Sequence, residues 1–312
     1  MNSETIVQRV QATATRRLGE GVETVEIRSS ARRSTADLRE VDIRVRGGRV
    51  VRLLVKLSPP VAPPSRPAEV YDARREAAVY RLLLSRRDLG APGLWDAWTS
   101  EGEVALLLER VEGVTLAETH RRETWLDAAR ALARLHERAT GLGRRHARAA
   151  HLLRVDGQTH RLWLRRAAEI VRDPRMDRIA RAHPEIVRRI GRLPRVLLHG
   201  EPYPANIMVD GGEVRLIDWE AAALGPDLMD LAALTSGTWQ DAALRREVAL
   251  AYRDASPAWR GEATKPFLAA LDACGVQVAI GWLGWSSTWI PPRDHRHDWL
   301  SAASEALERL GL

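Results

Sequence analysis

The sequence predicts an α+β protein with two lobes, a strand-rich N-terminal part and a mainly helical C-terminal part. Three observations lead to this prediction. Short apolar runs that alternate with polar residues fill much of residues 1–109, and helical periodicity dominates after residue 122. Between residues 196 and 220, three further apolar runs present a polar loop and a strand end together. Runs this short, bounded by Gly, Pro and Asp, are typical of buried strands.

The composition is that of a folded globular chain. Of the 312 residues, 45% are hydrophobic and 29% are charged, which are ordinary proportions for such proteins. We find no run of 18 uncharged apolar residues and no basic N-terminal segment followed by an apolar stretch, so we expect neither a membrane span nor a signal peptide. The single cysteine, Cys274, excludes an intrachain disulfide, and we expect a small core residue in a cytoplasmic protein.

The net charge of +7 is unevenly distributed. Residues 121–200 hold 20 Arg and 8 acids, whereas residues 201–312 have a net charge of −7. The Arg-rich segment 141–192 fits either a positive face for an anionic partner or a solvated helical surface in an Arg-biased chain, and we favour the second. Nucleic-acid binding is not expected, because this segment lacks the interleaved aromatic residues of single-strand binders.

The N-terminal lobe, residues 1–109, is expected to begin with a helix over residues 3–19. The expected strands are Val22–Ile27, Leu38–Val45, Arg49–Leu57, Leu94–Trp98 and Val104–Leu108. In the second strand, Val41, Ile43 and Val45 alternate with Asp42 and Arg44, as in a half-exposed antiparallel strand. A Pro-rich connector at Pro59–Pro67 precedes a helix at roughly Ala68–Ser85.

Two residue types are rare in this chain, and each occurs where phosphate chemistry needs it. The chain has two Lys, Lys56 and Lys265, against 46 Arg, and two Asn, Asn2 and Asn206. Lys56 lies at the end of the third strand. There its compact ammonium charge can contact phosphates in a way that the planar guanidinium group of Arg does not reproduce. Asn206 follows the polar loop and precedes Asp218, and amide and carboxylate oxygens suit Mg²⁺ that carries phosphates.

The helical part, residues 114–312, follows an expected hinge at residues 110–113. Its expected helices lie at 123–140, across 141–192 with interruptions at Gly157, Pro174 and Pro184, from Asp227 onward, and near 240–255, 262–274, 276–290 and 298–310. His136, on the apolar stripe of the first helix, is expected to pack there. The hairpin turn is expected at Asp210-Gly211-Gly212.

Two aromatic and polar groupings near the C-terminus stay open at this stage. Trp282, Trp285 and Trp289 recur at helical spacing, which fits a core face or a stacking platform for a substrate, and we favour the core. Asp294, His295, His297 and Asp298 resemble metal ligands by residue type, but their spacing matches no zinc pattern.

The central motifs resemble the catalytic core of the aminoglycoside phosphotransferase family, the small-molecule relatives of protein kinases. The family pattern is His-Gly-Asp, four residues, Asn, a hairpin, and Ile-Asp followed by Trp or Phe. The chain has His199, Gly200, Asn206, Ile217, Asp218 and Trp219 in place, and Glu201 replaces the family's catalytic Asp. The resemblance spans nearly the whole chain and implies a two-lobed protein-kinase-like fold, with a small antiparallel-sheet N-lobe and a helical C-lobe.

The resemblance also implies how a nucleotide is bound. Lys56 would bind the α- and β-phosphates, oriented by Glu76, which matches the family pattern better than the neighbouring acids Glu69 and Asp72. The Glu109 carbonyl and the Val111 N–H would bind adenine. The segment 28–34, which includes Ser30, takes the place of the glycine-rich loop, and it would cover the phosphates or form an ordinary surface loop.

The implied reaction moves the γ-phosphoryl group of ATP, or of GTP, to a hydroxyl of a small molecule such as an aminoglycoside-like antibiotic or another natural product. Asn206 and Asp218 would hold Mg²⁺, Glu201 would accept the hydroxyl proton, and Asp230 would brace the loop. The acidic segment 201–312 fits a cationic acceptor, and the Trp-rich helix fits a larger, flatter one. The alternative is a nucleotide-binding pseudokinase that acts as a partner-binding module.

Overall fold

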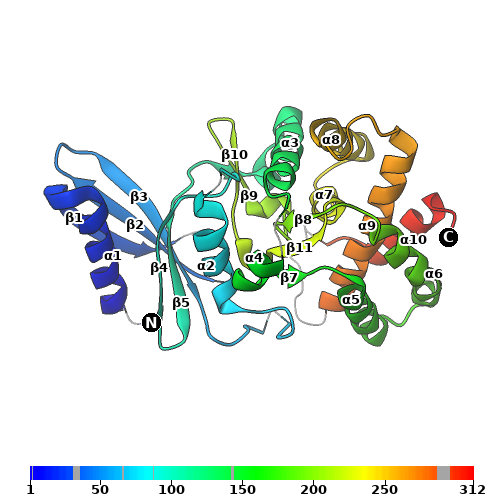
Figure 1. Cartoon of the computed structure of the whole chain (residues 1–312), viewed down its shortest axis with the longest axis horizontal. Coiled ribbons are helices and arrows are strands. Elements are labelled where there is room, and N and C mark those ends of the chain that lie inside the picture. Colours follow the sequence, from blue (N-terminus) through cyan, green and yellow to red (C-terminus); the bar gives the residue numbers. More distant parts are fainter. Residues whose placement is uncertain (2, 31–35, 65–66, 87, 142–143, 287–295) are drawn as a thin grey trace.

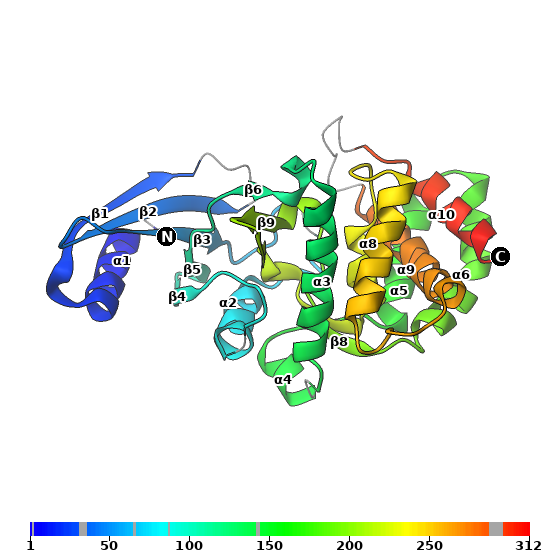
Figure 2. The same ribbon diagram turned by 90° about the horizontal axis from the view of Figure 1, so that it is seen from above.

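The computed structural model describes the chain except for residues 2, 31–35, 65–66, 87, 142–143 and 287–295. It shows the predicted α+β architecture: a sheet with its helices lies at one end of an elongated molecule and a helical lobe lies at the other (Figure 1). The helix α2 stands between the sheet and the helical lobe in two perpendicular views (Figures 1 and 2).

The N-terminal part is built on a five-stranded sheet in which every neighbouring pair is antiparallel. The strand order is β1-β2-β3-β5-β4. The elements are α1 (Ser3–Leu18), β1 (Val22–Ser29), β2 (Asp37–Val45), β3 (Val50–Ser58), α2 (Ala73–Leu82), β4 (Leu94–Ser100) and β5 (Glu103–Glu109). All five predicted strands and the N-terminal helix are confirmed.

Side chains alternate between the two faces of this sheet, and this alternation determines the direction in which Lys56 of β3 points. On one face, Val55 and Leu107 pack in a cluster with Ile6 of α1. On the other face, Leu106 belongs to the cluster that includes the buried side of α2. Because successive residues of a strand point in opposite directions, Lys56 points away from α1 and toward α2.

The helix α2 is shorter than predicted because it begins at a capping residue. The Asp72 carboxylate accepts a hydrogen bond from the Arg74 N–H, and helical geometry starts at Ala73. A side chain that satisfies an unpaired N–H at a helix start fixes that start. Glu69 and Asp72 therefore lie outside the helix, and Glu76 lies in its first turn.

The C-terminal lobe combines helices with two small three-stranded sheets, ordered β10-β9-β6 and β7-β11-β8. Its elements are β6 (Val114–Thr115), α3 (Arg122–Arg138), α4 (Arg144–Ala149), β7 (Leu153–Arg154), α5 (Gly157–Ile170), α6 (Pro174–Ile190), β8 (Arg195–Leu198), β9 (Ile207–Asp210), β10 (Glu213–Leu216), β11 (Ala223–Pro226), α7 (Leu228–Leu234), α8 (Ala242–Ala255), α9 (Thr264–Trp285) and α10 (Trp299–Arg309). The predicted hairpin turn is confirmed, since Asp210 pairs with Glu213 across Gly211-Gly212.

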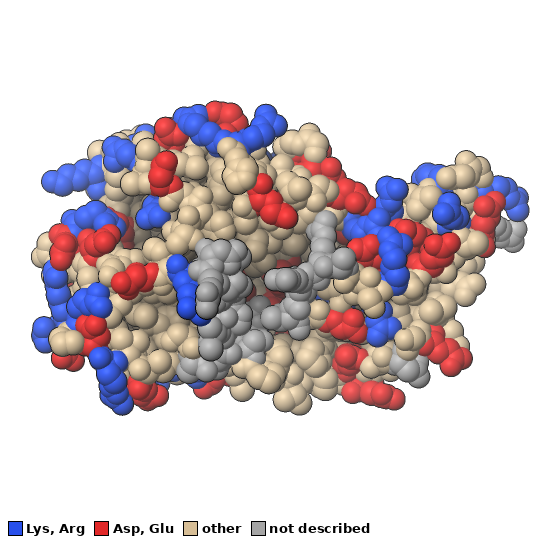
Figure 3. Space-filling view, turned by 180° about the vertical axis from the view of Figure 1, so that it is seen from behind, with Lys and Arg blue, Asp and Glu red and all other residues tan. Residues whose placement is uncertain are grey.

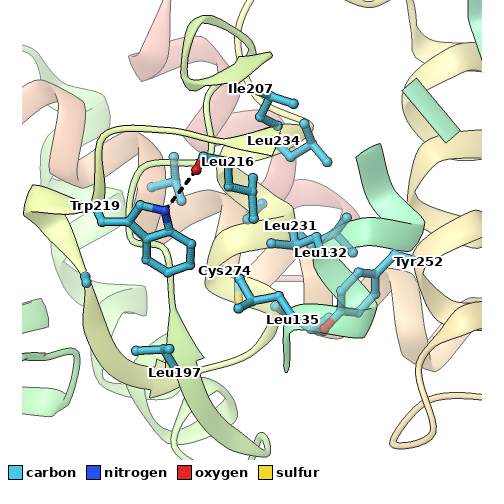
Figure 4. Packing of buried hydrophobic residues seen from close by; sticks show 14 of the residues in the cluster. Leu132, Leu135, Leu197, Ile207, Leu216, Trp219, Leu231, Leu234, Tyr252 and Cys274 are labelled. Atoms are coloured by element: carbon cyan, nitrogen blue, oxygen red, sulfur yellow. Dashed lines mark hydrogen bonds between the residues drawn. The ribbon is translucent and has the colours of Figure 1, made fainter. Parts of the chain in front are cut away.

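The core of this lobe is formed where α3, α7, α8 and α9 meet. Leu132 and Leu135 of α3 lie beside Leu231, Tyr252 and Cys274 (Figure 4). All five side chains are at most 1% exposed, so Cys274 is a small core residue, as predicted.

Two helix interruptions predicted from the sequence are wrong. The predicted interruption at Pro184 is absent, because α6 runs from Pro174 to Ile190. A proline inside a helix removes one backbone hydrogen bond, but α6 buries a face that includes Ile179, His183 and Ile186. The two helices predicted near 262–274 and 276–290 form one helix, α9, which passes through Gly275. A glycine inside a helix costs only about 1 kcal/mol, and burial of Cys274 and Val276 on either side outweighs this cost.

By length and composition α9 is the one helix among the described residues that could cross a membrane. In this structure it packs against α5, α7 and α10, and 56% of its most apolar window is buried within the fold. Core helices of folded proteins pass the same test of length and hydropathy.

Candidate functional site

A cavity of about 1180 Å³ lies between the sheet and the helical lobe. Seven of the residues proposed from the sequence line it: Lys56, Glu76, Glu109, Val111, Glu201, Asn206 and Asp218. These residues come from β3, α2, the end of β5, and the loops around β9 and β10. The fold thus brings together positions that are up to 162 residues apart in the chain.

The centre of the cavity is a lysine held between two carboxylates. Lys56 Nζ lies 2.7 Å from Glu76 Oε2 and 2.7 Å from Asp218 Oδ1. The side chains of Lys56 and Glu76 are 7% and 2% exposed, and that of Asp218 is 24% exposed. The lysine is therefore fixed by both lobes, through the acid on α2 and the acid after β10.

These contacts determine the charges of the group. Burial alone would lower the pKa of Lys56, but the attraction of Asp218 and Glu76 outweighs it and raises that pKa well above the usual value. Burial raises the pKa of Glu76 to about 7, against the opposing attraction of Lys56. Lys56 is thus charged at neutral pH, and Glu76 is poised to take a proton when that attraction weakens.

The backbone around Asp218 is held in an uncommon conformation. Asp218 has φ 65° and ψ 69°, a left-handed geometry that Asp and Asn tolerate better than most residues. The Trp219 N–H donates to Glu76 Oε1 at 3.1 Å, and the buried Trp219 indole N–H donates to the Leu216 carbonyl at 2.9 Å. Figure 4 shows this second bond. Glu76 therefore positions both Lys56 and the segment that carries Asp218.

The loop before Glu201 depends on a close backbone approach. Gly200 has φ +91°, and a Cβ atom there would lie 2.1 Å from the Ala221 carbonyl oxygen. Only glycine fits such a position. The Asp230 carboxylate accepts hydrogen bonds from the His199 N–H at 2.7 Å and the Gly200 N–H at 3.0 Å. Asp230 thus braces the loop, as predicted.

Two buried histidines connect this loop to the rest of the lobe. His199 Nε2 donates to the Ile217 carbonyl at 2.9 Å, and its Nδ1 accepts from the Glu201 N–H at 3.3 Å. Burial lowers the pKa of His199, which favours this neutral form. His136 packs inside the lobe as predicted, with Nδ1 2.7 Å from the Tyr252 hydroxyl and Nε2 3.2 Å from Asp230.

Asn206 and Asp218 lie at the same edge of the cavity. The Ile217 N–H donates to the Asn206 carbonyl at 2.9 Å, so the residue before Asp218 is bonded to Asn206. The Asn206 amide N–H donates to the Glu201 carbonyl at 2.9 Å. Among the described residues no group of three or more His, Cys, Asp or Glu side chains is placed to hold a metal. The oxygens of Asn206 and Asp218 fit Mg²⁺, which typically takes one or two carboxylates and completes its shell with phosphates and water.

Not all of the residues that were proposed to bind the nucleotide line the cavity. Glu109 and Val111 line it, at the end of β5 and just beyond. Ser30 does not line it: the Ser30 hydroxyl donates to Glu40 at 3.1 Å, and its N–H donates to the Leu38 carbonyl. Residues 31–34 of the segment proposed to cover the phosphates lie outside the described residues.

Two residues of the site were not identified from the sequence. Glu220 lines the cavity, and its charge helps to raise the pKa of Lys56. The sequence feature that could have identified Glu220 is its position two residues after Asp218, on the other side of the buried Trp219. Arg75 is 5% exposed and donates to the backbone carbonyls of Val70, His151 and Glu220 at 2.7–2.9 Å. It fastens α2 to the segment after Asp218.

Other sequence candidates have structural partners. In the Arg-rich segment 141–192, Arg175 pairs with Asp173, and Arg188 and Arg189 both pair with Glu185. On the face shown in Figure 3, basic and acidic side chains are interspersed. These pairs agree with a solvated helical surface.

The proposed polar grouping near the C-terminus is only partly described. Asp298 caps α10 by accepting from the Ser301 N–H at 2.9 Å, and the His297 ring packs on Trp299. Asp294, His295 and Trp289 lie outside the described residues.

Comparison with known proteins places this geometry in a family. The sequence matches a family model described as the phosphotransferase enzyme family over residues 31–263. No match was found among curated proteins.

Several solved structures share the fold. A choline kinase from Cryptosporidium parvum Iowa II has 14% identity and a TM-score of 0.67, with 99% of this chain and 94% of that chain covered. An amicoumacin kinase has 11% identity and a TM-score of 0.60, with 97% and 95% covered. An aminoglycoside 2'-phosphotransferase-IIIa has 15% identity and a TM-score of 0.56, with 97% of each chain covered. The predicted two-lobed protein-kinase-like fold is confirmed, and, because the family model covers most of the sequence, the chain belongs to the phosphotransferase enzyme family.

Proposed function

We propose that this phosphotransferase moves the γ-phosphoryl group of ATP to a hydroxyl of a small molecule, with Mg²⁺, in the cytoplasm. The observation that carries the proposal is the contact of Lys56 with both Glu76 and Asp218, in a cavity that Glu201 and Asn206 also line. Phosphoryl transfer depends mainly on positioning and on neutralising charge, and these residues supply both.

The lobe that contains the sheet binds the nucleotide. Lys56 places its ammonium group on the α- and β-phosphates, and Glu76 keeps it in that orientation. The Glu109 carbonyl and the Val111 N–H bind the purine at the end of β5. The aminoglycoside 2'-phosphotransferase-IIIa was solved with GDP and the amicoumacin kinase with AMP-PNP and Ca²⁺, which supports a nucleotide and a divalent cation here and leaves GTP as a second donor to test.

The chemistry takes place at Glu201. The acceptor oxygen forms a bond to the γ-phosphorus, the bond from that phosphorus to the β,γ-bridging oxygen breaks, and the hydroxyl proton passes to the Glu201 carboxylate. Asn206 and Asp218 would hold Mg²⁺, which would neutralise negative charge on the phosphate oxygens. Compared with Asp, the extra methylene of Glu201 moves the carboxylate by roughly 1 Å, a displacement that can change a rate by about 10²-fold, so the acceptor site is expected to be built around this longer side chain.

The acceptor class that the family comparison supports is a small-molecule alcohol. The solved relatives are a choline kinase, an amicoumacin kinase and an aminoglycoside phosphotransferase, so a role in antibiotic resistance is one version of the proposal. The replacement of Asp by Glu201 favours one second candidate, a pseudokinase that binds nucleotide without turnover.

Calorimetric titration with Mg–ATP tests the nucleotide site. Wild-type protein is expected to bind, Lys56→Ala and Asp218→Ala to lose at least about 10-fold in affinity, and Asp218→Ala also to lose its dependence on Mg²⁺. Lys265→Ala is the matched control, because Lys265 is the chain's other lysine and is exposed. If the wild type binds neither Mg–ATP nor Mg–GTP, the proposed function is wrong. ATP binding with no turnover of any alcohol would favour the pseudokinase.

A further inference from the structure

Four aromatic side chains line the part of the cavity formed by α5, α9 and the loop after β8, whereas Glu109 and Val111 line it from the end of β5. We call Trp163, Tyr203, Trp282 and Trp285 the aromatic wall; all four line the cavity and all four are half-buried. Trp163 and Trp285 are nearly parallel, with ring centroids 5.8 Å apart and planes 4° apart. Parallel indoles at this separation are offset, so each leaves part of its face uncovered by the other.

Packing of α5 against α9 builds this wall. A Cβ atom at Gly284 would lie 3.0 Å from the Trp163 carbonyl oxygen and 3.1 Å from the Trp163 ring. The absence of a side chain at this position lets Trp163 of α5 approach Trp285 of α9. On the other side, Trp282 stacks on Trp299 of α10, with centroids 5.4 Å apart and planes 11° apart. The wall is therefore supported from behind by the fold.

Tyr203 joins the wall to the reacting centre. Its ring centroid lies 5.1 Å from that of Trp282. Tyr203 is two residues from Glu201 and is flanked by Pro202 and Pro204, whose fixed backbone angles stiffen this loop. A molecule that rests on the wall therefore lies beside the carboxylate proposed to accept the hydroxyl proton.

Other carboxylates that line the cavity already have partners in the fold. Glu69 pairs with Arg166 at 3.0 Å, and Asp72 caps α2 and bonds His151 at 3.0 Å. Asp230 is buried against His199, Gly200 and His136. These acids are not arranged to receive several ammonium groups of a substrate.

The acids of residues 201–312 that line the cavity already have roles in the site. Among the described residues of this segment, the acids that line the cavity are Glu201, Asp218, Glu220 and Asp230. Two of them, Asp218 and Glu220, act on Lys56, Glu201 belongs to the catalytic loop, and Asp230 braces that loop. The charge of this segment therefore gives no separate binding site for a polycation.

We infer that the acceptor is an alcohol that carries a planar aromatic ring and no cluster of positive charges, and that its ring packs against the aromatic wall while its hydroxyl reaches Glu201. This inference rests on the proposed function. A single cation on the wall is a weaker match, because the Arg166 guanidinium already lies 5.6 Å from the Trp163 ring centroid. A second cation beside it would be repelled.

Four alcohols of different character test the inference. Naphthaleneethanol is compared with its fully hydrogenated counterpart decalinethanol, with choline and with kanamycin. Binding is measured by titration calorimetry with and without AMP-PNP, and ADP formation is followed with ATP. Naphthaleneethanol is expected to bind about 3- to 10-fold more tightly than decalinethanol, which is the gain that aromatic pairs give beyond their buried area.

Substitutions at Trp285 test whether the aromatic wall causes the preference for the aromatic alcohol. Trp285→Leu is expected to remove the preference for the aromatic alcohol, and Trp285→Phe to retain most of it. AMP-PNP affinity is expected to stay unchanged in both variants. Trp98→Leu is the control, because Trp98 lies on β4 and does not line the cavity.

Failure of this inference can be told from failure of the proposed function. The inference is overturned if decalinethanol binds as well as naphthaleneethanol, if Trp285→Leu keeps the preference, or if choline or kanamycin binds more tightly than naphthaleneethanol. The alcohols are also titrated without nucleotide, so these results stand whatever AMP-PNP does. Absence of AMP-PNP binding by the wild type would count against the proposed function alone.

Discussion

Replacement of Lys56 by methionine should make the stability of this protein depend more strongly on pH. Methionine keeps the length of the side chain and removes its charge, so two carboxylates lose their common partner. Lys56 Nζ lies 2.7 Å from both Glu76 and Asp218. At an effective dielectric constant of about 20, each contact represents about 6 kcal/mol of gross attraction, most of which is offset by the desolvation of the charges.

The net cost follows from how Glu76 responds. Breaking a buried ion pair typically costs about 3–5 kcal/mol when the remaining charge has no other partner. Glu76 avoids part of this cost by taking a proton, because burial already raises its pKa to about 7 and loss of Lys56 raises that pKa further. The folded variant then binds more protons than the unfolded chain between the unfolded value near 4.5 and the raised folded value. Its stability therefore falls as pH rises through this window.

Urea denaturation at two pH values measures this effect. Relative to the wild type, we expect Lys56→Met to lose about 3 kcal/mol of unfolding free energy at about pH 8 and about 1.5 kcal/mol at about pH 5.5, because one pKa unit between the wild-type value near 7 and pH 8 is worth about 1.4 kcal/mol. Lys265→Met, at an exposed position, should match the wild type at both. A loss that is the same at both pH values, or a stable Lys56→Met protein at about pH 8, would refute the reasoning about Glu76.

Substitutions at three other residues test separate parts of the structure. Glu201→Gln should lower turnover by about 10²–10⁴-fold with nucleotide affinity unchanged, and Glu201→Asp should lower turnover by up to about 10²-fold. Turnover is measured by ADP formation. Equal activity of the wild type and both variants would exclude Glu201 as the base. Among the described residues no partner lies within hydrogen-bond distance of the buried Tyr80 hydroxyl, so Tyr80→Phe should raise the unfolding free energy by about 1 kcal/mol, and a clear loss in urea denaturation would contradict this. Burial lowers the pKa of His160 to about 4 from 6.5, so its folded form binds fewer protons than the unfolded chain and stability is lost as pH falls between these values. His160→Gln should flatten that loss in denaturation curves, whereas replacement of the exposed His120 should leave the slope unchanged.

The order of strands and helices could be predicted because most elements carry a local signal. Strand alternation at Val41, Ile43 and Val45 and the glycine turn at Gly211-Gly212 needed no information from distant residues. The two-residue strands β6 and β7 were missed, because a segment of two residues shows no period. Helix α9 was divided in the prediction because the cost of Gly275 is local, while the burial that overrides it is tertiary.

Within the site, rarity and spacing pointed to some residues and not to others. Lys56 and Asn206 stood out because the chain uses Lys and Asn so little, and the structure places both in one cavity. The distance between Lys56 and Glu76 could not be derived from spacing, since it depends on how α2 docks on the sheet. Arg75 gave no signal among 46 arginines, although its three carbonyl bonds fasten α2 to the lobe below.

The aromatic residues show the same limit. The spacing of Trp282 and Trp285 on a helix favoured a core face over a substrate platform, whereas both side chains line the cavity. Trp163, which stacks on Trp285 at 5.8 Å, comes from a helix more than a hundred residues earlier. Only the fold brings the three indoles to one wall of the cavity that holds Lys56.

The most direct test of the central claim is to observe the phosphoryl transfer itself. The protein is incubated with a pool of small-molecule alcohols and with ATP labelled with heavy oxygen in the γ-phosphoryl group, and the products are identified by mass spectrometry. We predict that at least one alcohol gains the labelled phosphoryl group with the wild type and that none does with Asp218→Asn. The account is contradicted if the wild type binds ATP but labels only water, or if Asp218→Asn labels the same alcohol at the same rate.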